Sequence, residues 1–554
     1  MANAVRAYGR GVPNYKGARI PVSSHFNLTA WESYLQAYDD KIVVDFLKFG
    51  WPINCDTSVL PKSTLTNHGS ATGADGQQIL NTYICKELSY HSVCGPYHCN
   101  PFSTDCVISP LQCVPKRDST EPRIVHDLSF PPDASVNSCI PSDSFLNEPY
   151  KLRLPGIDRL VSFVNQLGRG CHVFKKDLKR AYRQIPVDPA DYHLLGMCID
   201  GLFYFHTTLP FGLRSATIAC QRTTKAAAFI LNDHGILADV YIDDFYGAAQ
   251  PASSHNAFAC MNRLFSELGL QASPDKDTPP SCEMTCLGVQ INTASMVLTV
   301  PQFRLQELQD ELSSWSTKTS CTRKELQRLL GKLAFVTSCV RPGRAFMCRL
   351  INTLKRAPLN CKSRITIPDD VRSDLQWWMF FLHHFNGVSV IPTDIVVSNP
   401  QLFATDACLT GCGAVCFGEF FHCEFPDKIL QQRLHINQLE LLTVVVAVKT
   451  WHSKLQGLTL ELLADNEATV HAINNQRSKD LFMQNCLREL WLCLAINNIN
   501  LRARYVEGSA NSFADALSRL HLGSEFATRV SSIVAEQGFC EIVLSDGIFH
   551  FTLL

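Results

Sequence analysis

The spacing of apolar residues separates the chain into regions with different expected structure. From about residue 100 to 300, short apolar runs alternate with helical patterns, which predicts an α+β or α/β domain. One helix there is well marked, because five apolar residues follow helical spacing and a glycine stop comes next: Phe258, Met261, Leu264, Phe265 and Leu268, followed by Gly269.

The pattern becomes helical near residue 301 and returns to alternating strands and helices near residue 396. Thr322 and Glu325 have the spacing of an N-terminal capping box, and apolar residues follow on one helix face. Farther along, "LFATDACLTGCGAVCFGEFFHCEF" predicts two or three strands, "INQLELLTVVVAVKTW" a helix and "LTLELLADN" another strand. We therefore expect a second α/β domain after a helical region.

Length and composition are those of a multidomain globular protein. At 554 residues the chain is too long for a single hydrophobic core. Apolar residues make up 46% and charged residues 18%, which excludes a wholly disordered chain. The formal net charge is −1, so an affinity for a polyanion has to come from local patches.

One such patch is a stretch without acidic residues. No Asp or Glu occurs from Leu326 to Pro368. The stretch contains nine basic residues: Arg328, Lys332, Arg341, Arg344, Arg349, Lys355, Arg356, Lys362 and Arg364. Basic helices of this kind suit a polyanion, and a solvated basic surface is the alternative interpretation.

The N-terminal residues contain no apolar signal region, and the apolar runs are too short to cross a membrane. We therefore expect an intracellular protein, cytoplasmic and/or nuclear and not secreted. In that environment the 24 cysteines are expected to be free thiols, because their spacing does not match a zinc site well.

The stretch "LADVYIDDFYG" places Asp243 and Asp244 between residues that favour strands. Their simplest interpretation is a tight hairpin turn. A functional interpretation needs a third carboxylate, and the strand-like run "CHVFKKD" ends at Asp177. Three carboxylates from two neighbouring strands would form an oxygen-rich site for two Mg²⁺ ions, which support phosphoryl transfer.

Four motifs in this region follow the order and approximate spacing of reverse transcriptase motifs. They are "KKDLKRAYRQI", "LPFGLRSATIACQR", "YIDD" and "LGLQASPDK" with "CLGVQI". Over these residues the chain resembles a retroelement polymerase. The resemblance implies that Asp177 and Asp243 are the main metal ligands, that Asp244 is the second aspartate of the hairpin, and that the Leu178 backbone carbonyl adds a ligand.

The same resemblance implies a set of nucleotide-binding residues. Tyr182 would lie under the sugar and exclude a 2′-hydroxyl, and a core tyrosine is the alternative. Lys276 would give a proton to the departing pyrophosphate, and a solvent-facing lysine is the alternative. The other members would contact the triphosphate, the incoming nucleotide or the template: Lys116, Arg123, Phe211 and Gly212.

A second set of carboxylates lies in the predicted C-terminal α/β domain: Asp406, Glu440, Asp465 and Asp515. Local alternatives exist, because Glu440 follows Asn437 at the spacing of a cap and Asp465 could cap the next helix. With "GSANSFADALSR", this order of residues is similar to the ribonuclease H of retroelements, which implies a second site with two Mg²⁺ ions. A loop histidine is not expected, since His471 is the only histidine between Asp465 and Asp515.

The order of the two resemblances implies a right-hand polymerase of fingers, palm and thumb, followed by a ribonuclease H-like domain. "RIVHDLSFPPDASVNSCIP" and "LGKLAFVTSCVRPGRAFMCRL" most resemble the DIRS-like elements, which move with a tyrosine recombinase. The expected domains are an N-terminal extension (1–95), fingers and palm (96–300), a basic helical thumb or connection (301–395), a ribonuclease H-like domain (396–522) and a tail (523–554).

The implied partners are an RNA template, a DNA primer, deoxynucleoside triphosphates and an RNA–DNA hybrid, with Mg²⁺ as cofactor and Mn²⁺ as a substitute. No membrane partner is expected. The alternative from another class is a domesticated or decayed polymerase that only binds nucleic acid. A Gypsy-like element with the same chemistry is a third interpretation.

Overall fold

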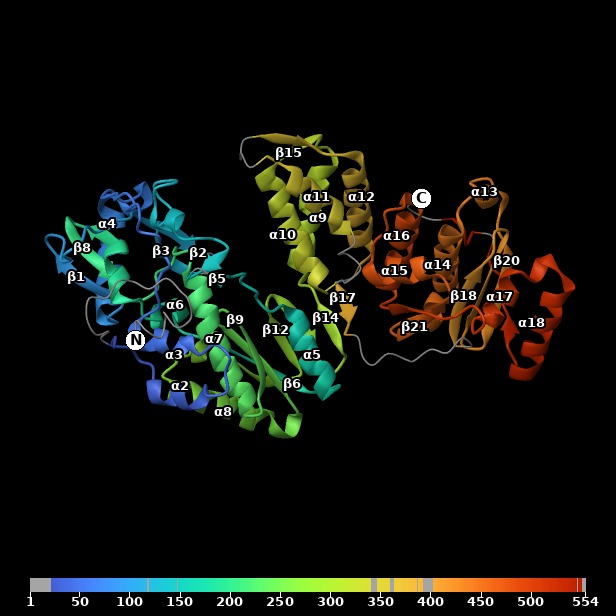
Figure 1. Ribbon diagram of the computed structural model, residues 1–554, viewed down its shortest axis with the longest axis horizontal. Coiled ribbons are helices and arrows are strands. Elements are labelled where there is room, and N and C mark those ends of the chain that lie inside the picture. The colour runs from blue at the N-terminus through green and yellow to red at the C-terminus, as the bar shows by residue number, and fades with distance from the viewer. Residues whose placement is uncertain are drawn as a thin grey trace. The chain divides into compact units, whose positions relative to one another are not determined.

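The computed structural model divides the chain into two compact units, Met1–Met284 and Thr285–Leu554. It describes residues 21–550 except 117–118, 147, 340–345, 359–362, 386, 392–401 and 546. Both units combine helices with β-sheets, as the apolar pattern predicts (Figure 1). Among the described helices, none has the length and apolar character needed to cross a membrane.

The first unit is built around a four-stranded antiparallel sheet, which we call the palm sheet. Its strand order is β11-β6-β10-β9, with bounds Thr278–Ser281, His172–Asp177, Asp244–Ala249 and Leu237–Tyr241. Helices α5 (Ile157–Leu167), α7 (Ala216–Asp233) and α8 (Pro251–Leu268) pack against it. The sheet shares one buried apolar core with α7 and α8.

Helix α8 is the well-marked helix of the sequence. Met261, Leu264, Phe265 and Leu268 are buried, and Gly269 ends the helix with a left-handed φ of 76°. A Cβ atom at Gly269 would lie 1.9 Å from the His25 carbonyl oxygen, so only glycine permits this close approach.

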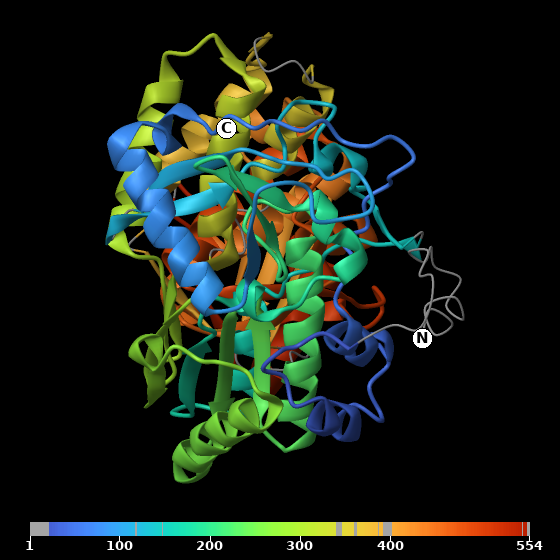
Figure 2. The same cartoon turned by 90° about the vertical axis from the view of Figure 1, so that its left-hand side faces the viewer.

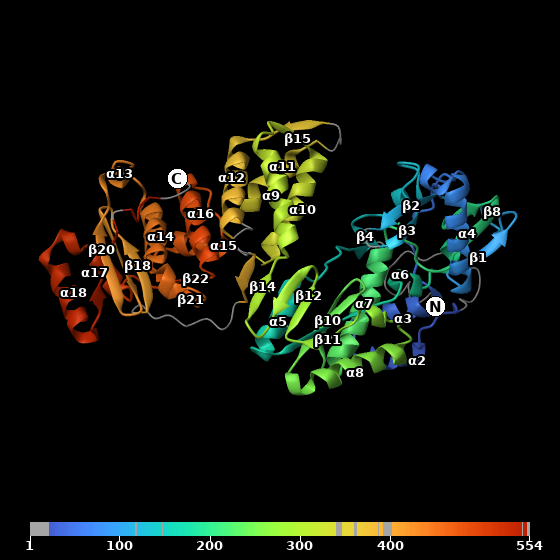
Figure 3. The ribbon, with the colours of Figure 1, turned by 180° about the vertical axis from the view of Figure 1, so that it is seen from behind.

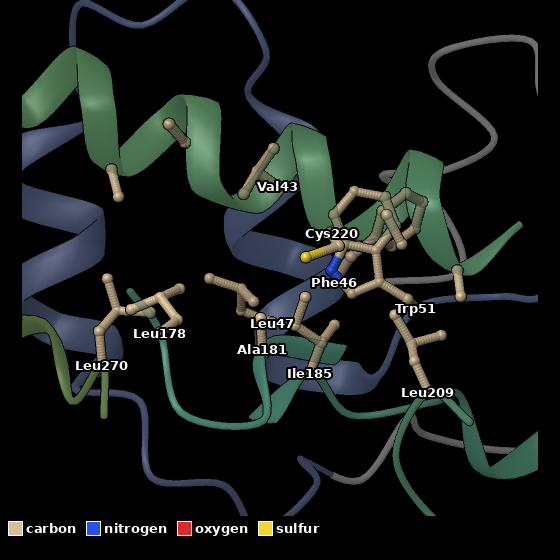
Figure 4. Close-up of a cluster of buried hydrophobic side chains, with 14 of the residues drawn as sticks. Val43, Phe46, Leu47, Trp51, Leu178, Ala181, Ile185, Leu209, Cys220 and Leu270 are labelled. Carbon is tan, nitrogen blue, oxygen red and sulfur yellow. The ribbon is translucent and has the colours of Figure 1, made fainter. Parts of the chain in front are cut away.

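Two helices that come before position 95 belong to the same packing as the palm sheet. Helices α2 (Leu28–Tyr34) and α3 (Ile42–Phe49) contact α8 and α7 respectively, and they appear in dark blue beside the long helices in Figure 2. Figure 4 shows Val43, Phe46 and Leu47 of α3 against Leu178 and Ala181, which follow Asp177 in the chain. Helices α2 and α3 of the N-terminal extension are therefore part of the core that also contains the residues after Asp177.

A second group of elements in the first unit has its own apolar core. Helix α4 (Gly73–Ser89) packs near a three-stranded sheet of order β1-β8-β7, with bounds Val93–Tyr97, Leu202–His206 and Gly196–Ile199. The ribbon β2 (Leu111–Lys116) and β3 (Ser119–His126) contributes Leu111 and Ile124 to this core. Short elements complete the unit: β4 (Ser144–Phe145), β5 (Glu148–Pro149) and α6 (Ala181–Gln184).

The second unit begins with strands and a helical region. Strand β12 (Glu283–Cys286) spans the boundary between the units, and β13 (Val289–Asn292), β14 (Val297–Thr299) and β17 (Val388–Val390) continue its sheet. The helices are α9 (Gln302–Ser316), α10 (Arg323–Cys339), α11 (Cys348–Arg356) and α12 (Asp369–His384), with a ribbon of β15 (Ser320–Thr322) and β16 (Arg364–Thr366). The predicted capping box is confirmed, because Thr322 and Glu325 exchange hydrogen bonds at the start of α10.

The acid-free stretch is less cationic in three dimensions than in sequence. Arg328 and Lys332 both contact Glu311 of α9, at 2.8 and 3.2 Å. Arg349 lies 3.4 Å from Asp374 of α12. Tertiary packing therefore supplies acidic partners from outside the stretch, which weakens the inference of a continuous basic surface.

The second unit ends in a six-stranded mixed sheet of order β22-β21-β18-β19-β20-β23. The strand bounds are Asn500–Tyr505, Thr459–Ala464, Phe403–Ala407, Gly411–Cys416, Glu419–Glu424 and Cys540–Glu541. Helices α14 (Ile436–Leu455), α15 (Glu467–Asn475), α16 (Leu481–Ile496) and α17 (Ser512–Ser518) lie with this sheet, and α13 (Asp427–Leu430) is a short turn of helix. The predicted strands and helix of this region are confirmed.

Described residues of the tail after residue 522, in which no pattern was recognisable, also contribute to this fold. Helix α18 (Ser524–Gln537) packs on α17 at the outer edge of the sheet (Figure 3), and β23 pairs in parallel with β20. Val530 and Phe539 are buried in one cluster with Phe513 of α17. The residues after 522 therefore share a core with the C-terminal sheet.

Candidate active sites

The palm sheet brings the three predicted carboxylates together. Asp177 is the last residue of β6, and it pairs directly with Asp244, the first residue of β10. Asp243 lies in the two-residue turn between β9 and β10, and the Leu178 backbone N–H donates to its carbonyl at 3.2 Å. Asp177 thus meets the distant pair Asp243 and Asp244 at one end of the two central strands, which we call the acidic edge.

Burial and mutual repulsion disfavour charge on these carboxylates. Burial raises the pKa of Asp177, and Asp244 adds to the effect. The pKa of Asp243 is raised by burial, then by Asp244 and Asp177. The cations nearby are lysines: Lys276 Nζ lies 3.3 Å from Asp177 Oδ2, and Lys175 Nζ lies 3.9 Å from Asp244 Oδ1. Because Lys276 is 60% exposed, this oxygen-rich donor set can accept a hard divalent cation in its place.

The turn that carries Asp243 is strained and needs support. Ile242 has a φ of +60°, a conformation that a β-branched residue rarely adopts. Gln221 of α7 braces the turn, because its Oε1 accepts from the Ile242 N–H at 2.7 Å and its Nε2 donates to the Val240 carbonyl at 3.0 Å. Gln221 was not among the predicted site residues, although it lies within the motif "LPFGLRSATIACQR".

A pocket of about 620 Å³ opens beside these carboxylates. Most of the predicted nucleotide-binding residues line it, together with three residues of the acidic edge: Arg123, Tyr182, Phe211 and Lys276, with Asp177, Leu178 and Asp243. Helix α4 supplies residues of another wall, which the motifs did not indicate.

Within this pocket the aromatic side chains are fixed by contacts. The Tyr182 hydroxyl lies 3.3 Å from Thr217 Oγ1, and its ring meets the Phe211 ring edge to face at 5.5 Å. The Arg123 guanidinium lies 5.6 Å from the centre of the Phe211 ring. Tyr182 therefore presents a rigid surface between the acidic edge and Phe211.

Among the described residues that line the pocket, the predicted nucleotide-binding residue Gly212 is absent. Gly212 has a φ of +103°, and a Cβ there would lie 2.0 Å from the His126 carbonyl, so its role in the structure is close backbone packing. Asn137 holds this loop by donating to the Gly212 carbonyl at 2.7 Å. The backbone of Lys116 lies in β2, but its side chain is outside the described residues.

The second set of carboxylates also assembles, with one member at a distance. Asp406 of β18, Glu440 of α14 and Asp465 after β21 place ligand atoms within 4.8 Å of one another. Asp515 of α17 is not in this group of three, and its Oδ1 lies 2.8 Å from Arg519 Nε. The four residues nevertheless interact, since Asp515 contributes to the raised pKa of Asp406.

The electrostatics of the second site favour a cation. Burial raises the pKa of Glu440, and Asp406 and Asp465 raise it further. Glu440 Oε2 is buried and has no hydrogen-bond partner. An unpartnered buried carboxylate oxygen beside two other acids is costly without a cation, so these residues fit a bound metal ion.

The local alternatives for this set do not apply. The α14 capping box is formed by His435 and Gln438, which leaves Glu440 free of that role. Helix α15 is capped by Asn466, whose side chain accepts from the Thr469 N–H. The "GSANSFADALSR" segment also serves the site, because Ser518 Oγ donates to Asp406 Oδ2 at 2.5 Å.

Comparison with known proteins finds a family match in the palm region. Residues 125–291 match the family model described as "Reverse transcriptase (RNA-dependent DNA polymerase)". This stretch contains the paired strands β6 and β10 and all three acidic residues of the palm edge.

Proteins with similar sequences include polyproteins of transposable elements. The Transposon Tf2-3 polyprotein and the Transposon Tf2-7 polyprotein of Schizosaccharomyces pombe (strain 972 / ATCC 24843) are each 23% identical to this chain over 428 residues. The match covers 74% of this chain and 29% of each polyprotein. The chain therefore spans less than a third of the length of these relatives.

Among solved structures, similar chains include the foamy viral protease-reverse transcriptase. One, in complex with double-stranded DNA, has a TM-score of 0.47 and 16% sequence identity, with 89% of this chain and 84% of that chain covered. Another, in complex with an RNA/DNA hybrid, has a TM-score of 0.42 and 16% identity, with 82% and 56% covered.

Proposed function

We propose that this chain is the reverse transcriptase part of a retroelement: an RNA-directed DNA polymerase that also cleaves the RNA strand of RNA–DNA hybrids. The observation that carries the polymerase proposal is the direct pairing of Asp177 with Asp244, with Asp243 in the adjoining turn, inside the region that matches the reverse transcriptase model. In this proposal the first unit forms fingers and palm, and the second forms the thumb or connection and a ribonuclease H-like domain.

In the polymerase site, Asp177 and Asp243 would hold two Mg²⁺ ions, with Asp244 and the Leu178 carbonyl as additional ligands. When bound, the ions would lower the pKa of the primer 3′-hydroxyl and neutralise charge on the transferred phosphate. Lys276 lines the pocket beside Asp177, and in this proposal its ammonium would protonate the leaving pyrophosphate. Mn²⁺ would serve as a substitute ion.

The remaining pocket residues would select and bind the deoxynucleotide. The Tyr182 ring, held by Thr217 and Phe211, would lie under the sugar and exclude a 2′-hydroxyl. Arg123 would contact the triphosphate as a charged fork. Lys116 and Gly212 stay predictions of nucleotide contact.

In the second site, Asp406, Glu440 and Asp465 would hold Mg²⁺, and Asp515 would join through the ion or its water. The unpartnered Glu440 Oε2 supports this assignment. Ions at this site would activate a water molecule for attack on an RNA phosphodiester. The DIRS-like subtype, the finer domain boundaries of the sequence and the intracellular location remain predictions.

The test uses the purified chain with Mg²⁺, a DNA primer on an RNA template, and a labelled RNA–DNA hybrid. We expect extension and cleavage from the unmodified protein. Asp243→Asn should abolish extension and leave cleavage largely intact, and Asp406→Asn should do the reverse, because the two acidic sites are separate. Equal loss of both activities from either change would contradict two sites.

The alternative function is that of a decayed polymerase that only binds nucleic acid. Its support would be binding of primer and template without extension under varied metals and primers. All seven predicted carboxylates are present, three at the acidic edge and four that interact in the second site, and this speaks for catalysis. Neighbouring reading frames would separate a DIRS-like element from a Gypsy-like one.

A further inference from the structure

Arg180 is a charged residue of the pocket to which neither the motifs nor the comparisons assign a role. It follows Asp177 by three residues and adopts a left-handed backbone conformation with a φ of 56°. Its Nη2 donates to Glu87 Oε2 at 2.6 Å and to Ser92 Oγ at 3.2 Å. Its guanidinium also lies over the Tyr90 ring, 3.8 Å from the ring centre.

These contacts leave an excess of positive charge beside the acidic edge. Glu87 is 8% exposed and also accepts hydrogen bonds from Arg183 Nε at 3.0 Å and Nη2 at 2.6 Å. One carboxylate therefore faces two guanidinium groups. The neighbouring His206 adds no charge, because burial and then Arg183 hold its pKa well below its usual value.

The two arginines differ in how much of their donor capacity is used. Arg183 is 3% exposed, and its Nη1 donates to His206 Nδ1 at 2.9 Å, so its fork is occupied by the protein. Arg180 is 23% exposed and lines the pocket, and within the described structure its Nε and Nη1 have no acceptor. Glu87, Ser92 and Tyr90 thus hold one edge of the Arg180 guanidinium and leave the other edge for a ligand.

We propose that Arg180 is a binding residue for the terminal phosphates of the incoming nucleoside triphosphate, oriented by Glu87 of α4. The proposal rests on the proposed polymerase function. Three residues of chain span at most about 11 Å, so a compact anion that reaches the Asp177 edge also reaches Arg180. A guanidinium with two free donor nitrogens suits bidentate contact with phosphate oxygens.

This assignment gives helix α4 a function in nucleotide binding. Glu87 is buried in α4 and fixes Arg180 from behind, while Lys86 of the same helix also lines the pocket. The helix lies before residue 95, in the part of the chain that carries none of the polymerase motifs. A pocket wall made by this helix explains why its carboxylate binds two arginines of the motif "KKDLKRAYRQI".

The test compares Arg180→Gln with Arg180→Lys and with Lys179→Gln as a matched control. Lys179 is exposed, is adjacent in sequence and does not line the pocket, so its change removes the same charge outside the site. Glu87 keeps Arg183 as a partner in each variant, which protects the fold. The measurements are KM and kcat for single-nucleotide extension, the Kd for primer–template, and the Kd for inorganic tripolyphosphate with Mg²⁺ by calorimetry.

For Arg180→Gln we expect KM for all four deoxynucleoside triphosphates to rise by at least about tenfold, equivalent to about 1.4 kcal/mol. The affinity for tripolyphosphate should fall in parallel, while the primer–template Kd and the melting temperature stay near those of Lys179→Gln. Arg180→Lys should be intermediate, because it keeps the charge and loses the fork.

The outcomes separate this inference from the proposed function. If the unmodified chain extends primers and Arg180→Gln matches Lys179→Gln in KM and in tripolyphosphate affinity, the inference is wrong. A change confined to the primer–template Kd would also overturn it, because Arg180 would then contact the nucleic acid backbone. If the unmodified chain does not extend primers but binds tripolyphosphate through Arg180, the binding site stands and the polymerase proposal fails. A chain that neither extends primers nor binds tripolyphosphate would overturn both.

Discussion

Gln221 offers the sharpest test of how the fold positions the acidic edge of the palm. Its side chain is 2% exposed and bridges the Ile242 N–H and the Val240 carbonyl, both of which come just before Asp243 in the chain. Gln221→Leu keeps the approximate volume of the side chain and removes both hydrogen bonds. The Ile242 N–H would then lose its partner, at a cost of about 1–3 kcal/mol in the free energy of unfolding.

The effect on catalysis should exceed the effect on stability. A β-branched residue at positive φ stores strain of about 1–3 kcal/mol, which the surrounding contacts have to hold. Without Gln221 the turn can relax and move the Asp243 carboxylate. A displacement on the order of 1 Å at a reacting centre costs roughly 100-fold in rate. We therefore expect primer extension to fall by about two orders of magnitude while hybrid cleavage is unchanged.

Asn232→Leu is the matched control for this change. Asn232 lies on the same helix, and its Nδ2 donates to the Ala238 carbonyl at 2.8 Å, at the end of β9 away from Asp243. The control should lower stability and leave extension intact. Thermal unfolding and single-nucleotide extension are measured for both variants, which separates the effect on stability from the effect on catalysis. If both variants lose extension equally, or if Gln221→Leu loses stability alone, the bracing role of Gln221 is refuted.

Three further predictions concern stability. The pKa values of Asp406 and Glu440 are raised, so both carboxyls favour the folded state most when they are protonated. Their contribution to the free energy of unfolding is therefore fully present below the ordinary carboxyl pKa and is lost as pH rises through the raised values. Mg²⁺ should therefore raise the melting temperature more at pH 8.5 than at pH 6, and Glu440→Gln should reduce this difference; an equal gain at both pH values would contradict it. Trp31→Ala, which removes a fully buried ring and its hydrogen bond to the Leu268 carbonyl, should cost about 3–5 kcal/mol in urea unfolding of the first unit. If Trp31→Ala left the free energy of unfolding nearly unchanged, the N-terminal helices would not be part of that core. Phe539→Ala should cost about 3 kcal/mol in the second unit, because Phe539 packs 5.0 Å from Phe513, and the exposed Val543→Ala is its control.

Local features were predictable from the sequence because they depend on neighbouring residues. The stop at Gly269 and the capping box of Thr322 and Glu325 are formed within a few residues, and both are present in the structure. The hairpin at Asp243 and Asp244 is equally local. The expectation that Asp177 would meet them came from the strand-like run that ends at Asp177, and in the structure β6 pairs with β10 so that Asp177 lies opposite Asp244.

The basic stretch and the pocket show the limit of sequence reasoning. The absence of acidic residues from Leu326 to Pro368 did not predict that Glu311 of α9 pairs with Arg328 and Lys332. In the same way, no periodicity links Glu87 to Arg180, which are 93 residues apart. Such pairs depend on which helix faces lie against each other.

By itself, therefore, the sequence determined the succession of strands and helices and the residue types offered for catalysis, because hydrophobic period, caps and turn residues act over short distances. Only the tertiary structure decided which charges are neutralised, which wall of the pocket comes from α4, and that α18 and Phe539 complete the C-terminal core. It also decided that Asp406, Glu440 and Asp465 form a tight group while Asp515 pairs with Arg519. These features depend on packing between segments that are distant in sequence, because that packing determines both which side chains are buried and which charges are paired.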